Sequence, residues 1–189
     1  NLPSPTNYTT ITSVSNDVYV GVLNDGTYRL PNNSTVWSAF NTGISLPDQP
    51  ASFALKGTTL YQTNRDGVYY YNGTTWVQIA DQFGAGSLSL PESFNSSDHG
   101  IVSGAGNKLY VFFSSKFDGQ GKIYSSNNAT AGPWSLITTT QLNESIWALK
   151  AFTGGTNVFA GYNKNGIFRS TNDGASWAFS NNGLTISPG

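Results

Sequence analysis

Short apolar segments alternate with polar turns along the whole chain. Segments such as residues 17–22 and 108–113 are rich in β-branched and aromatic side chains and are bounded by turn residues. This pattern favours β-strands. The dipeptides Asp25-Gly26, Asp66-Gly67 and Asn165-Gly166 separate neighbouring strands, and Asn-Gly and Asp-Gly accept the positive φ of tight hairpins. We therefore expect an all-β chain of antiparallel hairpins, with no helix.

The strand pattern repeats four times. Leucines at positions 2, 46, 90 and 142 recur at intervals of 44, 44 and 52 residues, and similar runs end at Trp37, Trp76, Trp134 and Trp177. Such a period predicts an array of small units, each too thin to bury its own apolar face. We place the modules at residues 1–44, 45–88, 89–140 and 141–184, with 185–189 beginning a further one.

Each module is predicted to contain four strands. In the fourth module we expect them at residues 145–152, 157–162, 166–170 and 177–180. Four-stranded meanders of this period are typical of β-propeller blades and, less often, of β-solenoid units, whose repeats are usually shorter and more even. We predict an all-β β-propeller with four blades present, forming either a complete small ring or part of a larger one. Because no polar capping repeat is visible, we favour continuation into further blades, in the parent chain or in a partner chain.

The clearest module ends in Ser170-x-Asn172-x-Gly174-x-Ser176-Trp177. This motif resembles the Asp box of BNR-type propellers, the family that includes sialidases, sortilin-like domains and some glucanases, although Asn172 stands where the motif usually has Asp. The resemblance implies a hairpin turn between strands three and four with the Trp beneath it. It gives Ser170, Asn172, Asp173, Gly174 and Trp177 a structural role. The blade pattern covers nearly the whole chain and indicates an architecture, not an activity.

Composition narrows the classes of partner. Charged residues make up 10% of the chain and the net charge is −1, which argues against a nucleic-acid ligand. No apolar run is long enough to insert into a membrane. The Asn/Ser/Thr-rich, Lys-poor composition is more typical of exported proteins, so we expect an extracellular or cell-surface location. There is no Cys, and His99 is the only histidine. We therefore expect no metal site and no cofactor, and we interpret His99 as a solvated loop residue.

Blade geometry indicates where a ligand could bind. Turns between strands two and three, and the connections between blades, share one end of a meander. Polar side chains gather in those segments, and the candidate ligand-binding residues are Asp48, Arg65, Asp66, Glu92, Asp118 and Glu144. A plainer interpretation is that acidic residues simply favour solvated turns.

Enzyme chemistry is hard to assemble from these residues. Arg29 and Arg169 lie on equivalent strands of different blades and Arg65 lies in a turn, so a sialidase-like arginine cluster is not expected. A glycosidase needs two carboxyl groups within about 5–10 Å. We therefore expect a non-enzymatic binding or adhesion module whose ligand is an extracellular glycan or protein. The alternatives are the non-catalytic portion of a BNR-type glycoside hydrolase, or a structural spacer in a large surface protein.

Overall fold

The structure is a computed structural model that describes residues 2, 7–45, 50, 52–81, 99–114, 121–128, 130, 133–137 and 144–185. In this part of the chain there are sixteen β-strands and no helix, arranged as four separate four-stranded sheets. Each sheet is an antiparallel meander in chain order, and its four strands make one blade. The fold-class prediction, a β-propeller of four-stranded antiparallel blades, is therefore confirmed.

The bounds of the strands are as follows. Blade 1 contains β1 (Tyr8–Val14), β2 (Asp17–Val22), β3 (Gly26–Leu30) and β4 (Ser38–Ala39). Blade 2 contains β5 (Ser52–Lys56), β6 (Thr59–Asn64), β7 (Gly67–Tyr71) and β8 (Trp76–Asp81). Blade 3 contains β9 (His99–Ser103), β10 (Leu109–Ser114), β11 (Gly121–Ser126) and β12 (Ser135–Leu136). Blade 4 contains β13 (Ile146–Ala151), β14 (Val158–Tyr162), β15 (Gly166–Ser170) and β16 (Ala178–Phe179).

The strands of blade 4 agree with those expected from the sequence to within two residues at each end. The hairpin turns also form where the Gly-containing dipeptides predicted them. Gly26 and Gly166 have φ angles of 96° and 78°, a region that side-chain-bearing residues rarely adopt. These glycines therefore allow β2–β3 and β14–β15 to reverse within a few residues.

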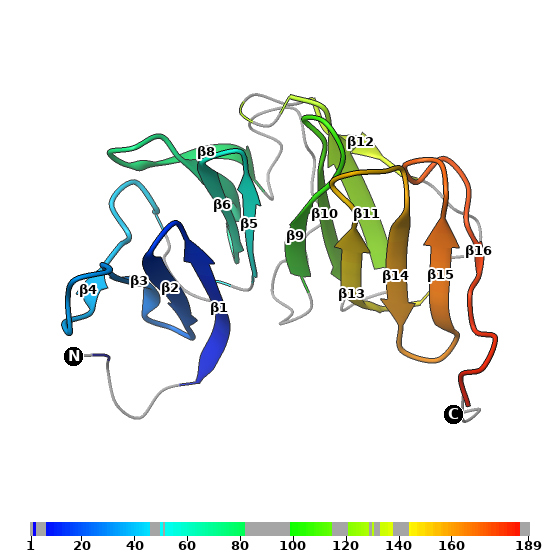
Figure 1. The fold of residues 1–189 in the computed structure, drawn as a ribbon, viewed down its shortest axis with the longest axis horizontal. Helices are drawn as coiled ribbons and strands as arrows, with labels where there is room; N and C mark the ends of the chain where they lie inside the picture. Colours follow the sequence, from blue (N-terminus) through cyan, green and yellow to red (C-terminus); the bar gives the residue numbers. More distant parts are fainter. Residues whose placement is uncertain are drawn as a thin grey trace.

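The four blades stand side by side in an open arc (Figure 1). The first strands of the blades, β1, β5, β9 and β13, contact one another in that order. Blades 1 and 4 lie at the two ends of the arc. The closed four-blade ring considered from the sequence is therefore not the arrangement found here.

The core lies between the blades. Three hydrophobic clusters are present among the described residues, one for each pair of neighbouring blades. Blade 2 shows the arrangement: Leu60, Tyr69 and Trp76 pack on blade 1, whereas Tyr61 and Val68 pack on blade 3. We call the first side of a blade its preceding face and the second its following face. Each inner blade is thus stabilised from both sides, as expected for units too thin to fold alone.

Candidate functional site

The topology gives every blade two ends. The turn between its second and third strands and the connection entering the blade share one end, which we call the connection end. In blade 4 this end carries residues 163–165 and the segment before β13, and it lies at the bottom of Figure 1. The turn between β15 and β16 lies at the opposite end.

Three of the six candidate ligand-binding residues lie in the described part of the chain. Arg65 and Asp66 form the β6–β7 turn of blade 2, and Glu144 lies two residues before β13 of blade 4. All three are therefore at the connection end, with blade 3 between the two positions. Asp48, Glu92 and Asp118 lie outside the described residues.

Asp66 is held within its own blade. Its side chain is buried, and the hydroxyl of Tyr69 donates a hydrogen bond of 2.7 Å to its Oδ2. The side-chain amide of Gln78 donates to its backbone carbonyl at 3.0 Å. Arg65 beside it is half-buried. The contacts of Asp66 therefore fix the β6–β7 turn and leave little of this residue to meet a ligand.

Glu144 links blades 3 and 4. Its backbone carbonyl accepts a hydrogen bond of 2.6 Å from the N–H of Gly121 at the start of β11. Its Oε2 accepts a bond of 3.3 Å from the backbone N–H of Lys164 in the β14–β15 turn. A Cβ at Gly121 would lie 2.2 Å from Cγ1 of Ile146. The close approach that glycine permits therefore positions the Glu144 carboxylate, half-buried, at the connection end.

Trp147 lies three residues after Glu144 and was not among the residues singled out from the sequence. It occupies an irregularity in the β13–β14 ladder, where the register shifts between Ile146 and Ala148. Its side chain is 62% exposed, whereas Ile146 is fully buried. The available signal was that Trp147 falls outside the repeat position shared by the other four tryptophans. An exposed indole and, three residues earlier, a positioned carboxylate thus give the connection end of blade 4 an apolar surface and a hydrogen-bond acceptor.

The position of His99 differs from the one predicted from the sequence. It is not a solvated loop residue but the first residue of β9, paired with Phe113 of β10 and 4% exposed. Burial lowers its pKa from 6.5 to about 3, because the charged imidazolium loses its hydration. His99 is therefore neutral at physiological pH. Asp98, which precedes it, lies outside the described residues.

The three arginines lie in different blades, as expected. In blade 1, Arg29 forms an ion pair of 2.5 Å with Asp17, and this bond lowers the pKa of the Asp17 carboxyl. At the same position in blade 4, Arg169 donates two hydrogen bonds, of 3.0 and 2.8 Å, to Oδ1 of Asn157. Arg65 is in the turn of blade 2. Each of Arg29 and Arg169 therefore binds a residue of its own blade.

The motif around Trp177 forms a compact turn at the opposite end of blade 4. The N–H of Gly174 donates to Oγ of Ser170 at 2.8 Å, and the N–H of Ser176 donates to Oδ1 of Asn172 at 2.9 Å. The indole N–H of Trp177 donates to the carbonyl of Gly174 at 3.0 Å. Asp173 reaches blade 3, where Lys108 and the hydroxyl of Tyr110 contact its carboxylate.

Among the residues that the structure describes, no three His, Asp or Glu side chains come together as metal ligands. The same residues contain no helix long and apolar enough to cross a bilayer.

Comparison with known proteins identifies the fold. No family model and no curated protein matches the sequence. Among solved structures, an ancestral GH74 enzyme matches 90% of this chain with 23% of its own length, at 16% identity and a TM-score of 0.64. The computationally designed Ika8 protein matches 89% of this chain with 47% of its length, at 12% identity and a TM-score of 0.61. YCF48 from Cyanidioschyzon merolae matches the whole chain with 61% of its length, at 14% identity and a TM-score of 0.60.

These likenesses support the β-propeller fold. At such identities they show the fold alone, and the chain spans less than two thirds of each of these proteins. The function must therefore be argued from the residues of this chain.

Proposed function

We propose that this chain is an exported, non-enzymatic binding module that recognises a neutral polysaccharide at the connection end of blade 4. The observation that carries the proposal is the 62% exposure of Trp147, three residues after Glu144. A large aromatic side chain in a folded domain is usually buried, so an indole that a shift in strand register leaves exposed needs a reason to be there. Contact with a ligand supplies one.

The chemistry of the two side chains suits a sugar. The apolar C–H face of a pyranose can pack on the indole of Trp147, while its hydroxyls donate to the carboxylate of Glu144. The bond from Lys164 N–H occupies one side of that carboxylate and fixes its position. The sparse charge of the chain favours a neutral ligand over an anionic one. In this arrangement Trp147 supplies affinity and Glu144 supplies orientation.

Two kinds of structural neighbour are consistent with such a module. Several are GH74 enzymes, and one of these is a GH74 xyloglucanase from Xanthomonas campestris. Another neighbour is YCF48 bound to a D1 peptide. Propellers of this architecture therefore serve both glycan and peptide ligands, and the exposed Trp favours the glycan here.

Affinity electrophoresis tests the proposal. The chain is run through native gels that contain xyloglucan, mannan or starch, with a gel lacking polysaccharide as the reference. We expect at least one polysaccharide to retard the wild-type chain and Trp147→Ala to migrate as in the reference gel. Glu144→Gln should weaken the retardation, because the amide oxygen is a poorer acceptor than a carboxylate.

Phe179→Ala is the matched control, because Phe179 is 63% exposed but lies on the last strand of the blade. It should be retarded like the wild type. Equal retardation of Trp147→Ala and wild type, or no retardation by any of the three polysaccharides, would refute the proposed site.

The alternative is that this chain is a fragment of a larger glycoside hydrolase of the BNR type. The resemblance of the Ser170–Trp177 motif to an Asp box and the coverage of 23% of a GH74 enzyme favour it. The discriminating experiment is hydrolysis of xyloglucan by the isolated chain. Reducing-end release that Glu144→Gln abolishes would favour the alternative, whereas retention without release favours the binding module.

A further inference from the structure

A buried polar pair lies between blades 1 and 2. Thr27 of β3 and Gln62 of β6 are 0% and 1% exposed, and the hydroxyl of Thr27 donates a hydrogen bond of 2.8 Å to Oε1 of Gln62. We propose that this pair selects blade 1, rather than another blade of similar pattern, as the neighbour on which blade 2 packs. The inference concerns the assembly of the blades and is independent of the ligand proposed above.

The strand register identifies the equivalent positions in the other blades. The second strand of each blade carries a run of four equivalent residues, at 18–21, 60–63, 109–112 and 158–161. The third residue of the run lies on the preceding face, and in chain order it is Val20, Gln62, Val111 and Ala160. The fourth residue pairs with a third-strand residue on the following face, which in chain order is Thr27, Val68, Ile123 and Ile167.

The two other interfaces hold aliphatic pairs at this place. Val68 and Val111 are in the hydrophobic cluster between blades 2 and 3, and Ile123 and Ala160 are in the cluster between blades 3 and 4. All four side chains are 0% exposed. The place is therefore fully buried in each of the three interfaces, and between blades 1 and 2 its residues are polar.

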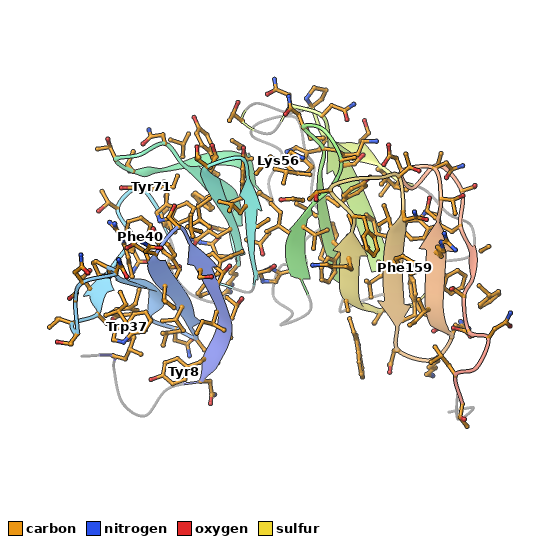
Figure 2. The ribbon with its side chains drawn as sticks, viewed as in Figure 1. Tyr8, Trp37, Phe40, Lys56, Tyr71 and Phe159 are labelled. Atoms are coloured by element: carbon orange, nitrogen blue, oxygen red, sulfur yellow. The ribbon has the colours of Figure 1, made fainter. Side chains whose placement is uncertain are left out.

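The surroundings of Gln62 are apolar. On its own face it pairs with Phe53 and Tyr69, which both belong to the cluster between blades 1 and 2. Phe40 and Tyr71, labelled in Figure 2 where these two blades meet, extend this cluster with ring centroids 4.6 Å apart. In such surroundings a polar group without a partner is costly, and its loss of hydrogen bonding lowers the equilibrium constant of packing by about tenfold or more.

Every wrong pairing of the blades would incur this cost. If blade 2 packed on the following face of blade 3, the amide of Gln62 would face Ile123. If blade 3 or blade 4 packed on blade 1, the hydroxyl of Thr27 would face Val111 or Ala160. Misassembly of similar units is a characteristic failure of repeat proteins. The Thr27–Gln62 pair therefore distinguishes the correct neighbour from blades that share the same strand pattern.

The pair is not the most stable solution for this place. Nε2 of Gln62 is buried and has no hydrogen-bond partner among the described residues. An aliphatic pair, as in the other two interfaces, would bury no such group. Buried polar groups that reduce stability in this way can specify one arrangement against its alternatives, which is the role we assign to Gln62.

Refolding of the 189-residue chain by dilution from urea tests the proposal. The fraction that does not return to the native state is measured from the ¹⁵N amide spectrum. Thr27→Val replaces the hydroxyl by a methyl group and makes the following faces of blades 1, 2 and 3 alike, so this fraction should increase by about tenfold. Thr27→Ser is the matched control. It keeps the hydroxyl and should refold like the wild type.

The double variant Thr27→Val/Gln62→Leu separates specificity from stability. It should be at least as resistant to urea as the wild type, because no amide remains buried without a partner, but its misassembled fraction should stay as high as that of Thr27→Val. Thr27→Val alone should lower the equilibrium constant of folding by about tenfold, and this effect should disappear in the Gln62→Leu background.

Two results would overturn the proposal. One is refolding of Thr27→Val with the same native yield as Thr27→Ser, a comparison that holds even if the double variant does not fold. The other is an equal loss of stability from Thr27→Val in the wild-type and Gln62→Leu backgrounds, which would show that the two side chains do not act as a pair.

Discussion

The indole N–H of Trp76 in blade 2 donates a hydrogen bond of 2.7 Å to the backbone carbonyl of Phe40, at the end of blade 1. The two aromatic rings meet edge to face, with centroids 5.7 Å apart. Trp76 thus connects blade 2 to the blade before it. The tryptophan that recurs in each module therefore packs at the junction between neighbouring blades, and the interblade hydrophobic clusters depend on it.

Removing Trp76 from this junction should destabilise the chain strongly. Trp76→Ala is expected to lower the free energy of unfolding by about 3–5 kcal/mol, since it leaves a cavity and an unsatisfied carbonyl. Trp147→Ala makes the same chemical change at an exposed position and should shift the free energy by about 0.5 kcal/mol or less. Urea unfolding followed by circular dichroism compares them. Equal losses in the two variants would contradict the assignment of Trp76 as a buried contact between blades.

Gly174 should resist substitution for two separable reasons. Its φ is +89°, and a Cβ would lie 2.8 Å from Cδ1 of Ile137 in blade 3. Gly183 has a similar φ of +83° with open space around it. Gly183→Ala therefore measures the backbone strain alone, about 1 kcal/mol. Gly174→Ala should cost at least about 1 kcal/mol more. If thermal unfolding gave the same loss for both, the contact with blade 3 would play no part.

The buried His99 predicts a specific pH dependence of stability. Its pKa is about 3 in the folded chain and 6.5 in the unfolded chain, so the unfolded state binds the extra proton between these values. The stabilisation from neutral His99 is complete above pH 6.5 and is lost as the pH falls toward 3. Between pH 7 and pH 5 the free energy of unfolding should fall by about 2 kcal/mol.

Urea unfolding at intervals of half a pH unit measures this slope. His99 is the only histidine, and unperturbed Asp and Glu titrate below this range, so His99→Gln should flatten the curve between pH 7 and pH 5. A slope that persists in His99→Gln, or a flat wild-type curve, would show that His99 does not lose its proton affinity on folding.

The sequence predicted the blades because their signal is repeated four times. Hairpin dipeptides such as Asn165-Gly166 act locally, and their turns form where expected. The residues that decide exposure depend on partners distant in sequence. His99 is buried because β9 pairs it with Phe113 and packs it toward blade 2, and no local pattern indicates this. The exposure of Trp147 likewise follows from a shift in strand register between Ile146 and Ala148, which composition and spacing do not encode.

The exposure of residues at the ends of the open arc also could not be predicted from the local sequence. Ile11 and Leu149 are equivalent aliphatic residues in equivalent strands, and the sequence gives no reason for one to be ten times as exposed as the other. The difference depends on which blade has a neighbour. Position within the array, rather than residue type, therefore decides how exposed these equivalent residues are in this structure.

The central functional claim is that a glycan binds through Trp147, and the indole N–H resonances test it most directly. The chain has five tryptophans, so a ¹⁵N-labelled sample gives one indole signal for each, and the five Trp→Phe variants assign them. Titration with the polysaccharide fragment that retards the chain should shift the Trp147 signal and leave those of the buried Trp76, Trp134 and Trp177 in place. Shifts confined to Trp37 or Trp177, with the Trp147 signal unmoved at saturation, would contradict binding at the connection end of blade 4.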